Sequence, residues 1–116
     1  MKFTWGAAAS ITLAAALGCA ALPAAAADID ADAAQALIKK NDCGKCHAAD
    51  REKKAPSWKK TAAKYKGKAD AEEKMTKHLT SSPKVKLEDG TEEEHKAINT
   101  KDPVAIKNLI AWIMAR

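Results

Sequence analysis

Five consecutive residues hold the most reactive set of side chains in the chain: Cys43-Gly44-Lys45-Cys46-His47. Two thiols separated by two residues, with an imidazole directly after the second, are the attachment signature of c-type haem. The spacing suits this chemistry because the thiols add across two vinyl groups on one edge of the porphyrin, while the adjacent imidazole binds the iron. The motif therefore predicts one covalently attached haem c, held by Cys43, Cys46 and His47.

The same cysteine pair is compatible with three other kinds of site. A thioredoxin-like redox pair is expected in a βαβ setting, and no strand pattern is visible in this sequence. A zinc site needs about four ligands, and only His78 and His95 remain outside the motif, without the spacing of a zinc finger. A structural disulfide between Cys43 and Cys46 stays open for an exported protein.

The first 27 residues differ in composition from the rest of the chain. They hold one charge near the start, an apolar run over residues 5–22 and four alanines before Asp28. This pattern is typical of a secretory signal peptide, and the run is too short and too rich in alanine for a permanent transmembrane helix. We expect residues 1–27 to be removed and residues 28–116 to form one domain in the periplasm. Lipid anchoring at Cys19 is not expected.

Length and composition limit the fold to one small domain. The chain has 116 residues, of which 30% are charged, 47% are hydrophobic and only 4% are aromatic. No room is left for a second core, and apolar residues are too plentiful for a disordered chain. A domain of this size usually needs a metal, a disulfide or a cofactor as support. A haem would supply a large, flat, apolar body for helices to wrap.

The elements that position the motif are expected to be helices, because apolar residues recur at helical spacing and no stretch alternates with a period of two. Asp70 and Glu73 resemble a capping box, whereas Asp102 and Pro103 are a typical helix start. The helical segments are expected at residues 29–40, 58–66, 70–80 and from 103 onward, with one or two turns at 92–98. We therefore predict an all-α fold of about four to five helices around one haem.

With these features together, residues 28–116 resemble a small bacterial class I cytochrome c over nearly their whole length. The resemblance implies the class I cytochrome c fold. It also implies that the Pro56 carbonyl accepts the Nδ1–H of His47, and that Trp58 lines the haem pocket. Trp112 matches the aromatic residue of the family's last helix, and plain core packing would suit both tryptophans equally well.

The sequence departs from the family pattern at the second axial ligand, which is normally a methionine in the loop before the last helix. Residues 85–101 contain no methionine, and His95 lies about where the family places it. We therefore predict that His47 and His95 bind the iron, with Met75 as the alternative sixth ligand and His78 on a solvated helix face. A second imidazole favours ferric iron, so the reduction potential should be lower than that of Met-ligated relatives.

Charge is distributed unevenly along the chain. Residues 39–68 hold eleven basic and three acidic residues, whereas residues 88–94 hold five acids. Such a field steers partners of opposite charge, so we expect redox proteins with acidic docking surfaces as partners. Nucleic acid and stable membrane insertion of the mature chain are not expected. The sequence shows no paired carboxylates, Ser/His/Asp set or phosphate-binding glycine loop, so an enzyme is not predicted.

The predicted function is that of a periplasmic one-electron carrier that cycles between Fe(III) and Fe(II). Three alternatives stay open at this point. One is an electron-transfer subunit of a larger oxidoreductase, which would share the same haem site. Another is a haem protein that binds a small ligand such as a gas, which would need a weak or absent sixth ligand. The third is an enzyme such as a small peroxidase, which would need an open distal site with an acid–base group, a role that His95 could take if it were not a ligand.

Overall fold

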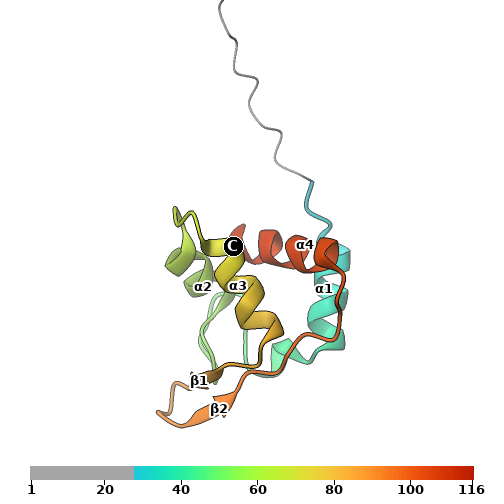
Figure 1. The fold of residues 1–116 in the computed structure, drawn as a ribbon. Helices are drawn as coiled ribbons and strands as arrows, with labels where there is room; N and C mark the ends of the chain where they lie inside the picture. Colours follow the sequence, from blue (N-terminus) through green and yellow to red (C-terminus); the bar gives the residue numbers. More distant parts are fainter. Residues whose placement is uncertain (1–27) are drawn as a thin grey trace, which may run out of the picture.

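The computed structural model describes residues 28–116, so the predicted signal peptide at residues 1–27 lies outside the described part. Residues 28–116 form four α-helices, one 3-10 turn and a two-stranded hairpin. Their bounds are α1 Ala31–Lys40, η1 Cys43–Lys45, α2 Trp58–Tyr65, α3 Ala71–Thr80, β1 Lys84–Lys86, β2 Glu92–Glu94 and α4 Pro103–Met114. α4 packs against α1, α2 and α3, while the hairpin lies at the opposite end of the molecule (Figure 1).

The starts of three helices follow their capping residues. The side chains of Asp30, Ser57 and Asp102 each accept a hydrogen bond from a backbone N–H two or three residues further on. These bonds satisfy N–H groups that have no partner inside the first helical turn. Pro103 takes the first position of α4, and Gly67 follows α2 with a φ of 74°, a conformation that glycine adopts without steric strain.

Two local expectations are wrong. Asp70 precedes α3, but its side chain makes no capping bond among the described residues and instead pairs with Lys74 at 2.7 Å. Residues 92–98 form no helical turns, because β2 pairs antiparallel with β1. The cross-strand neighbours of opposite charge are Lys84 with Glu94 and Lys86 with Glu92. Such pairs stabilise a hairpin, and they form only once the two segments meet in space.

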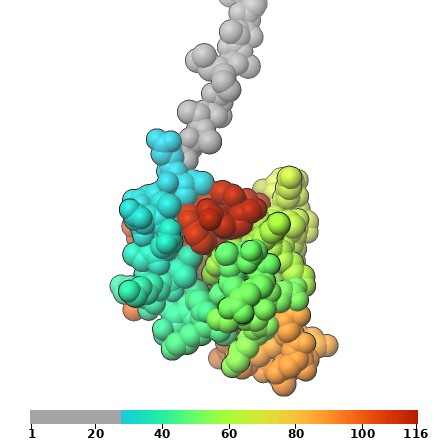
Figure 2. Space-filling view, turned by 180° about the vertical axis from the view of Figure 1, so that it is seen from behind, coloured from blue at the N-terminus to red at the C-terminus, as the bar shows by residue number. Residues whose placement is uncertain are grey.

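The core is built on one face of α4. Leu109 is the most buried of its side chains, with 1% of its surface exposed. The other members come from all four α-helices and, for Ile98, from the segment between β2 and α4: Ala34, Trp58, Met75, Ile98, Ile106, Ile110, Trp112 and Ile113. From the side opposite to Figure 1, the C-terminal helix fills the space between the N-terminal segment and α2 (Figure 2). No helix within residues 28–116 has the length and apolar character needed to cross a bilayer.

Two side-chain amides connect the ends of α1 to the C-terminal part of the chain. The backbone N–H of Asp30 donates to Asn108 Oδ1 at 2.9 Å, and Asn108 Nδ2 donates back to the Asp30 carbonyl at 2.8 Å. At the other end, the buried Asn41 donates from Nδ2 to the Leu37 carbonyl at 2.8 Å. Its Oδ1 accepts from the Asn99 backbone at 2.7 Å. α1 is thereby held in place directly before the cysteine motif.

Candidate cofactor site

A cavity of about 820 Å³ lies between the helices and the hairpin. This volume falls within the range of cofactor and small-molecule sites, which are mostly apolar with a few placed polar groups. The apolar side chains of its wall are Ile38, Trp58, Tyr65, Met75, Leu79, Val85, Leu87, Leu109 and Ile113. The same wall contains both motif cysteines and all three histidines of the chain, so the chemistry-bearing residues meet in one place.

The cysteine motif is placed by a tight turn directly after α1. Asp42 takes a left-handed conformation with a φ of 57°, and the His47 backbone N–H donates to the Cys43 carbonyl at 2.9 Å. This single turn brings Cys43, Cys46 and His47 to the cavity wall. Neither cysteine is joined to another cysteine within residues 28–116, and both are half-buried. Burial raises the pKa of the Cys43 thiol above its usual value.

His47 is oriented by the loop that follows the motif. Its Nδ1–H donates to the Pro56 carbonyl at 2.6 Å, and the backbone of Ala55 donates to the Cys46 carbonyl at 3.1 Å. A hydrogen bond from one ring nitrogen fixes the tautomer and leaves Nε2 with its lone pair for a metal ion. Burial lowers the pKa of His47, with the Pro56 carbonyl opposing the shift, so the ring is neutral at neutral pH.

Trp58 forms the wall behind His47. The two rings stack with centroids 4.4 Å apart and an interplanar angle of 21°. Trp112 meets Trp58 edge-on, at 6.3 Å and 77°, and the Arg116 guanidinium lies 4.1 Å from the centroid of the Trp112 ring. The two tryptophans therefore connect His47 to the core on α4. Trp58 is both a member of the core and a residue of the cavity wall.

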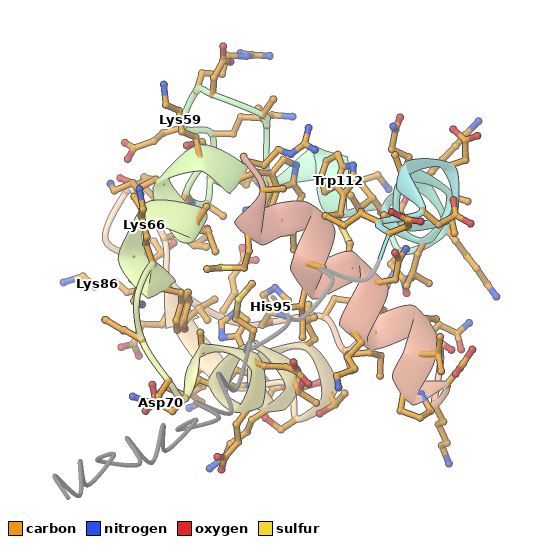
Figure 3. All side chains as sticks on the ribbon, turned by 90° about the horizontal axis from the view of Figure 1, so that it is seen from above. Lys59, Lys66, Asp70, Lys86, His95 and Trp112 are labelled. Atoms are coloured by element: carbon orange, nitrogen blue, oxygen red, sulfur yellow. The ribbon has the colours of Figure 1, made fainter. Side chains whose placement is uncertain are left out.

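His95 lies on the segment after β2 and is half-buried at the cavity wall; in the view from above its label falls between α3 and α4 (Figure 3). Its backbone N–H donates to the Pro83 carbonyl at 2.8 Å. Its ring centroid is 6.4 Å from that of His47. The side-chain Nδ1 is buried and has no hydrogen-bond partner among residues 28–116. A buried polar atom without a partner is uncommon in proteins and calls for an explanation such as an ion.

The distance between the two rings fits one metal ion held between them. Metal–imidazole bonds of about 2.0–2.1 Å place two opposed nitrogens about 4 Å apart and the ring centres about 6 Å apart. The observed separation of 6.4 Å between His47 and His95 is close to that value. Burial lowers the pKa of His95 to about 4, with His78 and His47 adding to the shift. The ring is therefore neutral at neutral pH, which is the form that binds metals.

Met75, the alternative sixth ligand, also reaches the cavity wall. It lies on α3, is only 4% exposed and belongs to the core cluster. The thioether therefore already has a packing role between α3 and α4. His95 differs in this respect, because its unpaired nitrogen lacks an equivalent role among the described residues.

The prediction that His78 lies on a solvated helix face is wrong. It is half-buried, lines the cavity, and its ring centroid lies 4.3 Å from that of His95. Burial lowers the pKa of His78 as well. The signal was present in the sequence, because Met75, His78 and Leu79 fall at i, i+3 and i+4 on one helix face. The neighbouring lysines of α3 hid that pattern.

The charges around the cavity are more mixed than the sequence predicts. Five lysines reach the cavity wall: Lys45, Lys60, Lys64, Lys86 and Lys96. The last two of these lie outside the basic segment 39–68. Glu93 and Glu94 of the hairpin also line it. Three lysines, Lys59, Lys66 and Lys86, lie on one side of the molecule in Figure 3. The hairpin thus brings both a lysine and part of the acidic segment next to the site.

Comparison with known proteins places the chain in a family. The family model described as Cytochrome c matches residues 31–116. The chain is also similar to a solved structure, described as the crystal structure of Class 1 cytochrome MtoD from Sideroxydans lithotrophicus ES-1. The two sequences are 56% identical over 76% of this chain and 97% of that chain, and the TM-score is 0.72. The search of curated proteins finds no match.

The family match begins at the first residue of α1 and extends through α4. The observed helices therefore correspond to the predicted class I fold. A cavity that joins the thiol pair to an inward-facing imidazole also fits a haem. The chain belongs to the cytochrome c family, as a small class I c-type cytochrome with one covalently attached haem c.

Proposed function

We propose that this cytochrome carries single electrons between redox proteins, with Cys43 and Cys46 as the thioether attachment points and His47 and His95 as the axial ligands. The bound haem supplies a one-electron Fe(III)/Fe(II) couple. The observation that carries the proposal is the distance of 6.4 Å between the ring centroids of His47 and His95, which both line the cavity. The unpaired Nδ1 of His95, counted over residues 28–116, supports it.

The remaining residues of the site keep this arrangement rigid. The Pro56 carbonyl holds His47 in one orientation through a bond of 2.6 Å, and such a bond raises the basicity of a ligating imidazole. Trp58 packs on the face of the same ring. The Pro83 carbonyl fixes the backbone of His95. Because both imidazoles are held by the fold, their positions need not change between the two oxidation states, which favours rapid electron transfer.

The ligand pair also sets the expected reduction potential. A Met/His pair raises the potential of a c-type haem, whereas a second imidazole donates more strongly and favours ferric iron. We therefore propose a lower potential than that of Met-ligated relatives. With His95 bound there is no open coordination position, which favours an electron carrier over a protein that binds small ligands.

We propose that the protein acts in the periplasm and docks to redox proteins with acidic surfaces. The composition of residues 1–27 supports export to the periplasm and removal of that segment. The lysines on the cavity wall support docking to redox proteins with acidic surfaces, since complementary charge raises the rate of encounter. A carrier that diffuses freely and a fixed subunit of an oxidoreductase share this site, and copurification with a partner would separate them.

Absorption and EPR spectra of the purified ferric holoprotein test the ligand assignment. We expect a low-spin bis-imidazole spectrum without the weak far-red band of a sulfur–iron bond. We also expect the ferrous protein to bind carbon monoxide slowly or not at all, because His95 must first leave. A far-red band in the wild-type protein would identify Met75 as the ligand and overturn the assignment of His95. Rapid binding of carbon monoxide would favour the small-ligand alternative.

A further inference from the structure

One face of α2 presents three polar side chains to the cavity. Thr61, Lys64 and Tyr65 all belong to the cavity wall, and they fall at i, i+3 and i+4, the spacing of neighbours on a helix surface. Thr61 and Tyr65 are half-buried, and Lys64 is exposed. Neither the haem attachment nor the axial ligation described above uses any of the three, so their place beside the cofactor has no role in the proposed function.

Positive charge gathers at this end of α2. The helix itself contains no acidic residue. The ammonium nitrogen of Lys64 lies 5.4 Å from the centroid of the Tyr65 ring, and that of Lys68 lies 5.8 Å from it. Neither of these lysines forms an ion pair within residues 28–116. The hydroxyls of Thr61 and Tyr65 are therefore accompanied by cationic charge that no side chain of this part of the chain neutralises.

Three of the other lysines on the cavity wall are already paired with a carboxylate. The pairs are Lys45 and Lys96 with Asp42, and Lys60 with Glu52. Lys86 of β1 makes no ion pair in the described segment, but it faces Glu92 across the hairpin and its strand carries no hydroxyl. Lys64 combines a charge without a counter-ion with two neighbouring hydroxyls, and this set of donors suits a carboxylate.

α2 begins beside the haem attachment motif and extends away from it. The backbone N–H of Trp58 donates to the carbonyl of Ala48, directly after His47, at 2.9 Å. Lys64 lies about 9 Å further along the helix axis than Trp58. α1, which leads into the motif, and α2 lie on opposite sides of the molecule (Figure 1). The vinyl groups and the propionates of a haem leave opposite edges of the porphyrin, so attachment at the motif directs the propionates away from it.

We propose that Thr61, Lys64 and Tyr65 form a binding site for a propionate carboxylate of the haem, with Lys64 as its counter-charge. The ammonium group and the two hydroxyls donate hydrogen bonds, and the carboxylate accepts them. The site goes beyond the function proposed above, because it depends neither on the identity of the sixth ligand nor on the redox partner. It would fix the rotation of the haem in its cavity from the edge that carries no thioether.

The charge of Lys64 also has an expected effect on the iron. A carboxylate near the haem stabilises Fe(III), the more positive oxidation state, and a neighbouring ammonium group offsets this effect. Lys64 should therefore raise the reduction potential and lower the pKa of the propionate. Lys66 is the matched control, because it is an exposed lysine at the end of the same helix but does not belong to the cavity wall.

The test measures the reduction potential against pH for holoproteins of the wild type, Lys64→Gln, Lys64→Arg, Tyr65→Phe, Lys66→Gln and Lys86→Gln. Proton NMR of the haem propionate signals reports the protonation of the carboxylate directly. We expect Lys64→Gln to lower the potential at neutral pH and to move protonation of the propionate upward by about one pH unit. Tyr65→Phe should give a smaller change in the same direction. Lys64→Arg, Lys66→Gln and Lys86→Gln should resemble the wild type.

Two results would overturn the site on α2. Equal changes in Lys64→Gln and Lys66→Gln would reveal a general effect of surface charge without a specific contact. A change in Lys86→Gln together with a wild-type response in Lys64→Gln would place the carboxylate at β1. Both results would leave the electron-carrier proposal untouched, because the visible and EPR spectra of the same samples report the axial ligands independently.

Discussion

The buried amide of Asn41 should contribute more to stability than the more exposed amide of Asn108, although each makes two hydrogen bonds to the backbone. Asn41 is 4% exposed and joins the Leu37 carbonyl to the Asn99 backbone N–H. A typical intramolecular hydrogen bond contributes about 0.5–1.5 kcal/mol net, and a buried group left without a partner costs about 1–3 kcal/mol. For Asn41→Ala these values predict a loss of about 2–3 kcal/mol in the free energy of unfolding.

Asn108→Ala is the matched control. It removes the same number of bonds, but water can reach the freed groups of Asp30, which lie near the surface. The expected loss is then about 1 kcal/mol or less. Urea titrations of both holoproteins, followed by far-UV circular dichroism, measure the two values, and equal slopes would show that the denatured states are comparable. If Asn41→Ala lost no more stability than Asn108→Ala, the two hydrogen bonds by which Asn41 joins α1 to Asn99 would have no special energetic role.

Four further perturbations test the site and the core. His95→Met should raise the reduction potential and introduce the far-red sulfur–iron band, measured by a spectroscopic redox titration; an unchanged or lower potential would contradict the ligand assignment. Cys43→Ser should remove one thioether, visible as a shift in the pyridine haemochrome spectrum, and well-folded protein without haem would contradict the role of the cofactor in the core. Leu109→Ala should cost about 2–5 kcal/mol in a urea titration, because its side chain is 1% exposed. Electron exchange with an acidic redox protein should slow as ionic strength rises, and a rate independent of salt would argue against steering by the basic surface.

The helices could be predicted because their signals are local. Ser57 and Asp102 mark helix starts through bonds to backbone groups three or two residues further on. The apolar face of α4 is a pattern within one segment. The cysteine motif is local too, so its turn and the family could both be expected from the sequence.

Apart from the capping box at Asp70, whose side chain pairs locally with Lys74, the errors concern contacts between distant segments. The hairpin forms because Lys84 and Lys86 meet Glu94 and Glu92 across a turn, and no property of residues 92–98 alone distinguishes that pairing from a helical turn. His78 was misplaced for a related reason. Its neighbours on α3 are charged, and only the cavity, which several elements build together, draws that face of the helix inward.

Local opening of the hairpin has a consequence for the haem site. Its strands have three residues each, and segments with few buried contacts open locally at a small fraction of the global unfolding energy. His95 directly follows the second strand, so the side chain that we propose as the sixth ligand is carried by a short hairpin. If His95 is that ligand, order in residues 84–94 and occupancy of the sixth coordination position are thermodynamically linked. Amide hydrogen exchange in that short stretch should act as a reporter of whether the iron holds its distal partner.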